Sequence, residues 1–165
     1  EQMAQAMAQA VVDPGADAAA LAELRAGSVG EALRLALLDG LKLYGDLIAL
    51  MNTMPNLDRA RALALADAAG ARGSEAKLDL LYTLIDIALS RLARTCAGHA
   101  PLAQAAPNEA ATFARLCAHP AQARAWADTA QTALARARHG RAVNLDPGAL
   151  VLDTLFKLSD TATPR

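Results

Sequence analysis

Two aspartates on the most apolar stretch of the chain are the first candidates for chemistry. Asp79 and Asp86 are seven residues apart, so on a helix they share a face. Two carboxylates that share a site can act as general acid and general base. The alternative is that they form the one solvated or salt-bridged stripe of an otherwise apolar helix. We expect the second arrangement and assign no catalytic residue.

The histidines and cysteines show no pattern of metal ligands or nucleophiles. His99, His119 and His139 fall in or beside expected loops and helix ends, and no pair has the i, i+4 spacing of two ligands on one helix face. We interpret Cys96 and Cys117 as small buried hydrophobes, with a reactive thiol as the alternative. A disulfide scaffold does not follow from two such cysteines, and a reducing cytoplasm is the expected compartment.

Positive charge gathers in the C-terminal third of the chain, at Arg115, Arg124, Arg136, Arg138 and Arg141. These arginines could form a patch that faces phosphates. A solvated helix face is the favoured alternative, because acidic residues elsewhere bring the net charge to −1 and no aromatic residues interleave for base stacking. The charge balance also argues against a free-standing nucleic-acid binder.

Trp126 is the only tryptophan of the chain and stands among alanines. It is either a core residue or an anchor for a partner, since tryptophan is enriched at protein interfaces. We favour the core and keep Trp126 as a possible partner contact.

No glycine-rich phosphate loop is present, so we expect no cofactor, no bound metal and no small-molecule ligand.

The elements that would carry these residues are all expected to be helices. The chain has 165 residues, of which 54% are hydrophobic and only 3% aromatic, and the excess is alanine and leucine, the strongest apolar helix formers. Apolar periodicity predicts an all-α fold with helices at about 1–11, 17–26, 28–38, 41–53, 58–69, 75–97, 108–118 and 121–138, followed by a last helix after Asp146. The helix at 75–97 is apolar on two faces, which is typical of a central bundle helix.

Capping signals predict where these helices begin and end. Ser28 and Glu31 have the spacing of a capping box, and Ser74 can cap the longest helix. Gly140 is expected to follow the end of the helix at 121–138. Asp146 and Pro147 have the residue types of an N-cap and a first helical position.

No segment has the length and composition of a membrane span or a signal peptide. The chain opens without an initiator methionine, and we expect it to be a fragment of a longer protein.

Residues 27–33, 39–41 and 144–146 carry three short motifs that together resemble the C-terminal region of delta-prime subunits of bacterial DNA polymerase III clamp loaders, of the alpha-proteobacterial type. The segment 27–33 is similar to the sensor-2 pattern G-S-x-R-x-A-L of AAA+ clamp-loader subunits, through Gly27, Ser28, Ala32 and Leu33. A second motif resembles the family's junction between lid and collar domains, at Asp39, Gly40 and Leu41. The third is similar to the family's C-terminus, at Asn144, Leu145 and Asp146. The middle of the chain matches only in helix pattern.

The chain differs from the sensor-2 pattern at one position, and this difference fits a subunit that does not hydrolyse nucleotide. In relatives that hydrolyse nucleotide, the arginine of the motif reaches the terminal phosphate, but here Gly30 takes its place. A glycine supplies no charge to a phosphoryl group in transfer, and delta-prime usually serves as a non-hydrolysing stator. Gly27 and Ser28 can equally be a plain helix stop and helix start.

The resemblance implies a three-helix AAA+ lid at residues 1–39, followed by a helical-bundle collar domain at 41–165. It implies a non-catalytic assembly module of the clamp loader, which packs against the gamma/tau and delta subunits in the cytoplasm and meets DNA only through the assembled loader. Polymerase catalysis would lie in other subunits of the complex. Alternatives are an unrelated helical scaffold or regulatory domain and, least favoured, a helical enzyme with a carboxylate or histidine site.

Overall fold

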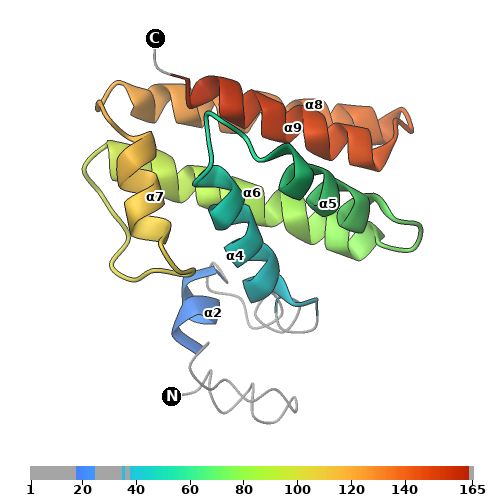
Figure 1. Ribbon diagram of the computed structural model, residues 1–165, viewed down its shortest axis with the longest axis horizontal. Coiled ribbons are helices and arrows are strands. Elements are labelled where there is room, and N and C mark those ends of the chain that lie inside the picture. The colour runs from blue at the N-terminus through green and yellow to red at the C-terminus, as the bar shows by residue number, and fades with distance from the viewer. Residues whose placement is uncertain (1–17, 25–34, 36–37, 164–165) are drawn as a thin grey trace.

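The fold is all-α, as expected, in a computed structural model that describes residues 18–24, 35 and 38–163. Within these ranges there is no β-strand. The helices are α2 (Ala18–Leu24), α4 (Gly40–Met51), α5 (Arg59–Gly70), α6 (Glu75–Cys96), α7 (Glu109–Leu116), α8 (Gln122–Ala142) and α9 (Pro147–Thr161), arranged as in Figure 1. The helices expected at 1–11 and 28–38 lie outside the described residues, apart from single positions.

Helix α6 is the centre of the bundle. It packs against α4, α5, α7 and α8, and both of its predicted apolar faces are buried. Its fully buried residues include Leu80 and Leu84 on one face and Leu81 and Ile85 on the other. The prediction of a central helix from two apolar faces is therefore confirmed.

Close contacts at two glycines join α5, α8 and α9 into a second layer. A Cβ atom at Gly70 would lie 2.8 Å from the backbone nitrogen of Gly148, and a Cβ atom at Gly140 would collide with the side chain of Leu150. Gly140 was expected to follow the end of a helix, but α8 continues through it to Ala142. Its physical role is to let α9 approach closely, so the predicted helix end was wrong.

Two of the helix starts show aspartate caps. Asp146 accepts a hydrogen bond from the backbone N–H of Ala149 at 2.7 Å, with Pro147 in the first turn, which confirms the predicted start of α9. Asp58 caps α5 in the same way through Arg61. Ser74 precedes α6 but makes no capping hydrogen bond with its side chain, so that prediction was wrong. The Ser28–Glu31 capping box lies outside the described residues.

The chain reaches α4 through a tight turn at Leu38 and Asp39, and Gly40 is the first residue of the helix. Asp39 has the left-handed backbone conformation, with φ at 52°. A Cβ atom at Gly40 would lie 2.7 to 2.9 Å from atoms of Leu35, so only glycine fits. Leu35, like Leu21 and Leu24 of α2, belongs to the same hydrophobic cluster as the bundle. The division into a lid at 1–39 and a collar at 41–165 stays a prediction.

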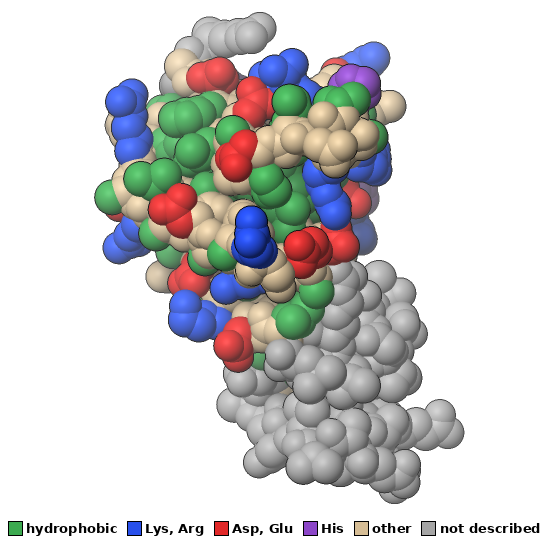
Figure 2. All heavy atoms as spheres, turned by 90° about the vertical axis from the view of Figure 1, so that its right-hand side faces the viewer, with side chains coloured by type: hydrophobic (Ala, Val, Ile, Leu, Met, Phe, Trp, Pro, Cys, Tyr) green, Lys and Arg blue, Asp and Glu red, His purple; other side chains and the backbone are tan. Residues whose placement is uncertain are grey.

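The outer surface mixes charged and apolar side chains. Figure 2 shows lysine, arginine, aspartate and glutamate side chains interspersed with hydrophobic ones on one face of the described part. Among the helices of that part, none is long and apolar enough to cross a membrane.

Candidate functional site

A buried ion pair between Arg91 and Glu109 is the most densely bonded polar site of the described residues. Arg91 comes from the C-terminal half of α6, and Glu109 is the first residue of α7. Asn108, directly before it, takes the left-handed conformation, which asparagine tolerates better than most residues. This turn delivers Glu109 into the bundle, where only 1% of the residue is exposed.

Both carboxylate oxygens of Glu109 are fully used. Oε1 accepts from Arg91 Nε at 2.8 Å and from the Tyr44 hydroxyl at 2.5 Å. Oε2 accepts from Arg91 Nη2 at 3.1 Å and from the backbone N–H of Ala105 at 2.6 Å. A buried carboxylate requires this degree of pairing, because an uncompensated buried charge costs several kcal/mol.

Arg91 also connects the bundle to α2. Its Nη1 donates to Glu23 Oε2 at 2.9 Å, and its Nη2 donates to the carbonyl of Ala103 at 2.7 Å. The site therefore joins α2, α4, α6, α7 and the loop before α7 through one guanidinium and one carboxylate. We call the group formed by Glu23, Tyr44, Arg91 and Glu109 the buried junction.

Two members of the buried junction, Tyr44 and Arg91, have raised pKa values. Burial, followed by the hydrogen bond to Glu109, raises the pKa of Tyr44 far above its ordinary value, so the phenol stays a donor. Burial alone would lower the pKa of Arg91, but its hydrogen bonds to Glu109 and Glu23 outweigh that effect and raise it. Through these hydrogen bonds the junction links α2, α4, α6 and α7.

The buried junction was missed from the sequence, although a signal was present. Arg91 lies eleven residues after Leu80, which places it on the same apolar helix face as Leu84 and Ile87. A charged residue on a buried face demands a partner. The identity of that partner, Glu109, depends on how α7 folds back on α6 and is not readable from spacing.

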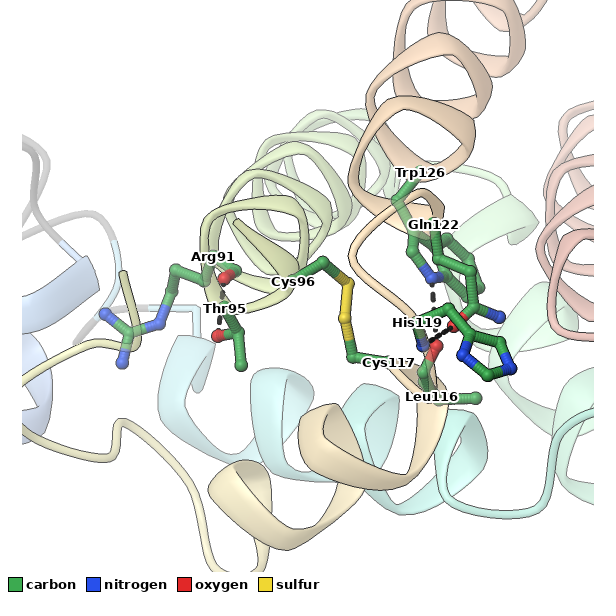
Figure 3. The surroundings of a disulfide bond; sticks show 8 residues. All are labelled: Arg91, Thr95, Cys96, Leu116, Cys117, His119, Gln122 and Trp126. Carbon is green, nitrogen blue, oxygen red and sulfur yellow. Dashed lines mark hydrogen bonds between the residues drawn. A yellow bond between two sulfur atoms is a disulfide. The ribbon is translucent and has the colours of Figure 1, made fainter. Parts of the chain in front are cut away.

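The other end of α7 is held by a disulfide between Cys96 and Cys117, shown in Figure 3. It joins the last residue of α6 to the residue after α7, with the two Cα atoms 5.3 Å apart. The interpretation of two separate buried thiols is thus corrected, because the return of α7 along α6 brings the two sulfurs together. Disulfides are typical of oxidising compartments, so this bond runs against the expected cytoplasmic setting.

Trp126 is a core residue and not a surface anchor. It is 0% exposed, and its indole N–H donates to the carbonyl of Leu116 at 3.2 Å, beside the disulfide (Figure 3). The possible partner contact at Trp126 is therefore corrected, since a fully buried ring has no surface to offer another protein.

Asp79 and Asp86 do share a face, as expected, but they face arginines. Both line an open groove of about 580 Å³ between α6 and α8, together with Arg138 and Arg141. Asp79 forms an ion pair with Arg141, and both side chains are partly exposed. No histidine lines this groove. The arrangement is that of a salt-bridged surface stripe, as favoured from the sequence.

Most arginines of the C-terminal third are paired within the chain. Arg136 binds Asp153 at 2.7 Å, and Arg124 lies 3.9 Å from Asp128. Arg115 donates to the carbonyls of Asn52 and Met54 just after α4. These contacts engage Arg115, Arg124 and Arg136 within the chain.

The histidines lie on the surface of the described part. His99, His119 and His139 are all exposed. Among the residues that the structure describes, no group of three histidine, cysteine, aspartate or glutamate side chains is placed to hold a metal ion.

The motifs behind the family resemblance are only partly within the described ranges. Gly27, Ser28, Gly30, Ala32 and Leu33 lie outside them. Asp39 lies in the turn before α4, and Gly40 and Leu41 are the first two residues of that helix. The third motif is the link between α8 and α9, at Asn144, Leu145 and Asp146.

The ending motif is a helix stop followed by a helix start. Asn144 has φ at 58° and Leu145 donates its backbone N–H to the carbonyl of Gly140 at 2.9 Å, which closes α8 in a Schellman motif. Asp146 then caps α9. These residue types thus have local geometric roles.

Comparisons with protein-family models, with curated proteins and with solved structures each find no match to this chain.

Proposed function

We propose that this chain is a non-catalytic assembly module of a bacterial DNA polymerase III clamp loader, equivalent to the lid and collar region of a delta-prime subunit. The observation that carries the proposal is the combination of the sensor-2-like segment, the Asp39–Gly40–Leu41 junction and the Asn144–Leu145–Asp146 ending in one chain. Its partners would be the gamma/tau and delta subunits, and DNA would be reached only through the assembled loader.

The fold is compatible with such a role. Several helices of the bundle expose small side chains, among them Ala64, Ala68, Ala125, Ala127 and Ala135. Helix faces with small side chains permit close approach of another helix. The larger exposed hydrophobics, Leu63, Leu102, Val143, Leu145 and Phe156, are spread over several elements.

The direct test is association with the cognate subunits. The purified chain is mixed with the collar region of gamma/tau or of delta, and each mixture is run on size exclusion. We expect co-elution with at least one of the two. Separate elution from both would count against the assignment and favour an unrelated helical scaffold.

A second test uses the sequence of the full-length gene. We expect a strand–helix ATPase-like domain, with an S-R-C motif near its end, to be encoded before Glu1. A gene that encodes no such domain there would favour the scaffold alternative.

The proposed cytoplasmic setting predicts the oxidation state of Cys96 and Cys117 in cells. In a reducing compartment Cys96 and Cys117 should be present as thiols. Rapid alkylation in intact cells, followed by mass measurement, should find both cysteines labelled. Unlabelled, bonded cysteines would place the protein in an oxidising compartment and contradict the proposal.

A further inference from the structure

The disulfide closes the segment of chain that contains α7 and the loop before it. Cys96 is the last residue of α6 and Cys117 directly follows α7, with their Cα atoms 5.3 Å apart (Figure 3). Between them lies Glu109, whose carboxylate binds Arg91 of α6 at 2.8 Å. The ion pair thus holds the N-terminal end of α7 on α6, and a bond that electron transfer can break holds its C-terminal end.

Noncovalent contacts hold the same C-terminal end of α7. Arg115 donates hydrogen bonds to the carbonyls of Asn52 at 2.8 Å and Met54 at 2.7 Å. The indole N–H of Trp126 donates to the carbonyl of Leu116 at 3.2 Å. Because none of these contacts uses sulfur, we expect them to persist when the disulfide opens. They would keep the two cysteines close enough to bond again, so both redox states should share one fold.

The two sulfurs differ in how easily a reagent in solution can reach them. Cys96 is only 7% exposed, whereas Cys117 is partly exposed. Cys117 lies in the short connection between α7 and α8, beside the exposed His119 (Figure 3). Thiol–disulfide exchange requires direct access of the attacking thiolate to a sulfur. A reagent should therefore react first at Cys117.

We propose that Cys96 and Cys117 form a reversible redox switch, which is open as two thiols under reducing conditions and is closed by hydrogen peroxide. Its closed state fixes α7 and the loop at 97–108 on α6, and Cys117 is the sulfur that reagents reach first. A disulfide in a protein of a reducing compartment is usually transient and redox-sensing. The inference rests on the contacts around α7 and does not require the clamp-loader assignment.

The closing reaction is a two-electron oxidation in two steps. The Cys117 thiolate attacks one oxygen of hydrogen peroxide, which gives a sulfenic acid and releases the other oxygen as water. The Cys96 thiolate then attacks the sulfenic sulfur, forms the S–S bond and releases the second water. The two thiols lose two electrons and two protons, and the peroxide gains them.

The opening reaction uses a dithiol as the reductant. One of its thiolates attacks the Cys117 sulfur, and Cys96 leaves as a thiolate. The second thiol of the reductant then displaces Cys117 from the mixed disulfide. The reductant ends as a disulfide, and its two protons pass to the two cysteines.

The first experiment measures whether the bond opens and closes without unfolding. The purified chain is oxidised with hydrogen peroxide, reduced with dithiothreitol in the absence of denaturant, and oxidised again after the reductant is removed. Alkylation followed by mass measurement counts free thiols at each stage. We expect none, both and none, on a monomer whose far-UV circular dichroism does not change. A bond that opens only in urea, or a reduced chain that loses its helical signal, would make the disulfide a structural cross-link and overturn the switch.

Hydrogen exchange measures what the switch controls. Amides in the segment 97–116 should exchange about tenfold or more faster in the reduced chain than in the oxidised one. Locally opening amides of α9, which packs on α5 and α8, should change by less than about twofold. The matched control, Cys96→Ala/Cys117→Ala, should exchange like the reduced chain with and without dithiothreitol. Equal exchange of the segment in both redox states of wild type would contradict the proposal.

Two single variants test the order of reaction. Cys96→Ser leaves only Cys117, and Cys117→Ser leaves only Cys96. Each variant is mixed with oxidised glutathione, and the mixed disulfide is followed by mass. We expect Cys117 to react about tenfold or more faster than Cys96, because it is the more exposed of the two. Equal rates, or a faster Cys96, would overturn Cys117 as the point of entry.

Discussion

The buried junction and the groove between α6 and α8 use the same types of side chain for opposite purposes. In the first, Arg91 and Glu109 are almost completely removed from solvent and every oxygen of the carboxylate is bonded. In the second, Arg141 and Asp79 pair with side chains 37% and 47% exposed. A buried pair is costly to break, whereas an exposed one is screened by water and contributes little. The comparison shows that the fold depends on the buried ion pair, whereas the exposed ion pair contributes little to stability.

The largest effect is expected from removing the carboxylate of the buried junction. Glu109→Ala should lower the free energy of unfolding by about 3–5 kcal/mol, because it leaves Arg91 buried with only Glu23 as a counter-charge. Urea unfolding followed by circular dichroism measures this. The double variant Arg91→Met with Glu109→Leu should lose much less than the sum of the single losses. Additive losses would show that the two side chains act independently and contradict the account.

The disulfide holds the opposite end of α7 from Glu109, and its loss should rank next. Cys96 and Cys117 are 21 residues apart, so breaking the bond should cost about 3 kcal/mol from the entropy of the unfolded chain. Unfolding of the oxidised protein with and without dithiothreitol gives the value. A Cys96→Ala/Cys117→Ala variant serves as control and should not respond to the reductant. Equal unfolding midpoints of the wild type in both conditions would mean that the bond carries no stability.

Tyr44 offers an intermediate perturbation of the buried junction with a pH signature. Tyr44→Phe removes one hydrogen bond to a charged acceptor and should cost about 1.5–3 kcal/mol at neutral pH. The pKa of Tyr44 is raised in the fold, so its stabilisation is complete below the ordinary value of 10.0 and is lost as the pH rises above it. The stability difference between wild type and Tyr44→Phe should therefore shrink above pH 10.0, as measured by urea unfolding across the alkaline range. A difference that does not change with pH would contradict the buried phenol.

The smallest effect should come from the exposed pair. Asp79→Asn should change the free energy of unfolding by less than about 1 kcal/mol, and added salt should reduce the change further. The same urea measurement at low and high ionic strength checks it. A loss as large as that of Glu109→Ala would erase the distinction between the two regions.

The sequence predicts the helical elements of this fold well, because their signals are local. Asp146 and Pro147 mark the start of α9, and the two apolar faces of α6 announce its central position. The same local reasoning fails at Gly140, whose role is set by Leu150 on the following helix. A glycine that stops a helix and a glycine that admits a neighbour look alike in sequence.

The candidate sites were harder to predict from the sequence, because they form only where different helices pack against one another. Arg91 meets Glu109 across 18 residues, and Cys96 meets Cys117 across 21. Both pairings depend on the path of the loop from residue 97 to 108, for which the sequence has no periodic signal. The exposed pairing of Asp79 was anticipated as a salt-bridged stripe, since an apolar helix with two acids on one face needs a solvated side.

The proposal that this chain is an assembly module of a clamp loader is most directly tested by native mass spectrometry of the chain mixed with the cognate gamma/tau and delta collar regions. The account predicts a species that contains the 17.1 kDa chain together with at least one of the two partners. A spectrum in which the chain keeps its own mass at every partner concentration would contradict it.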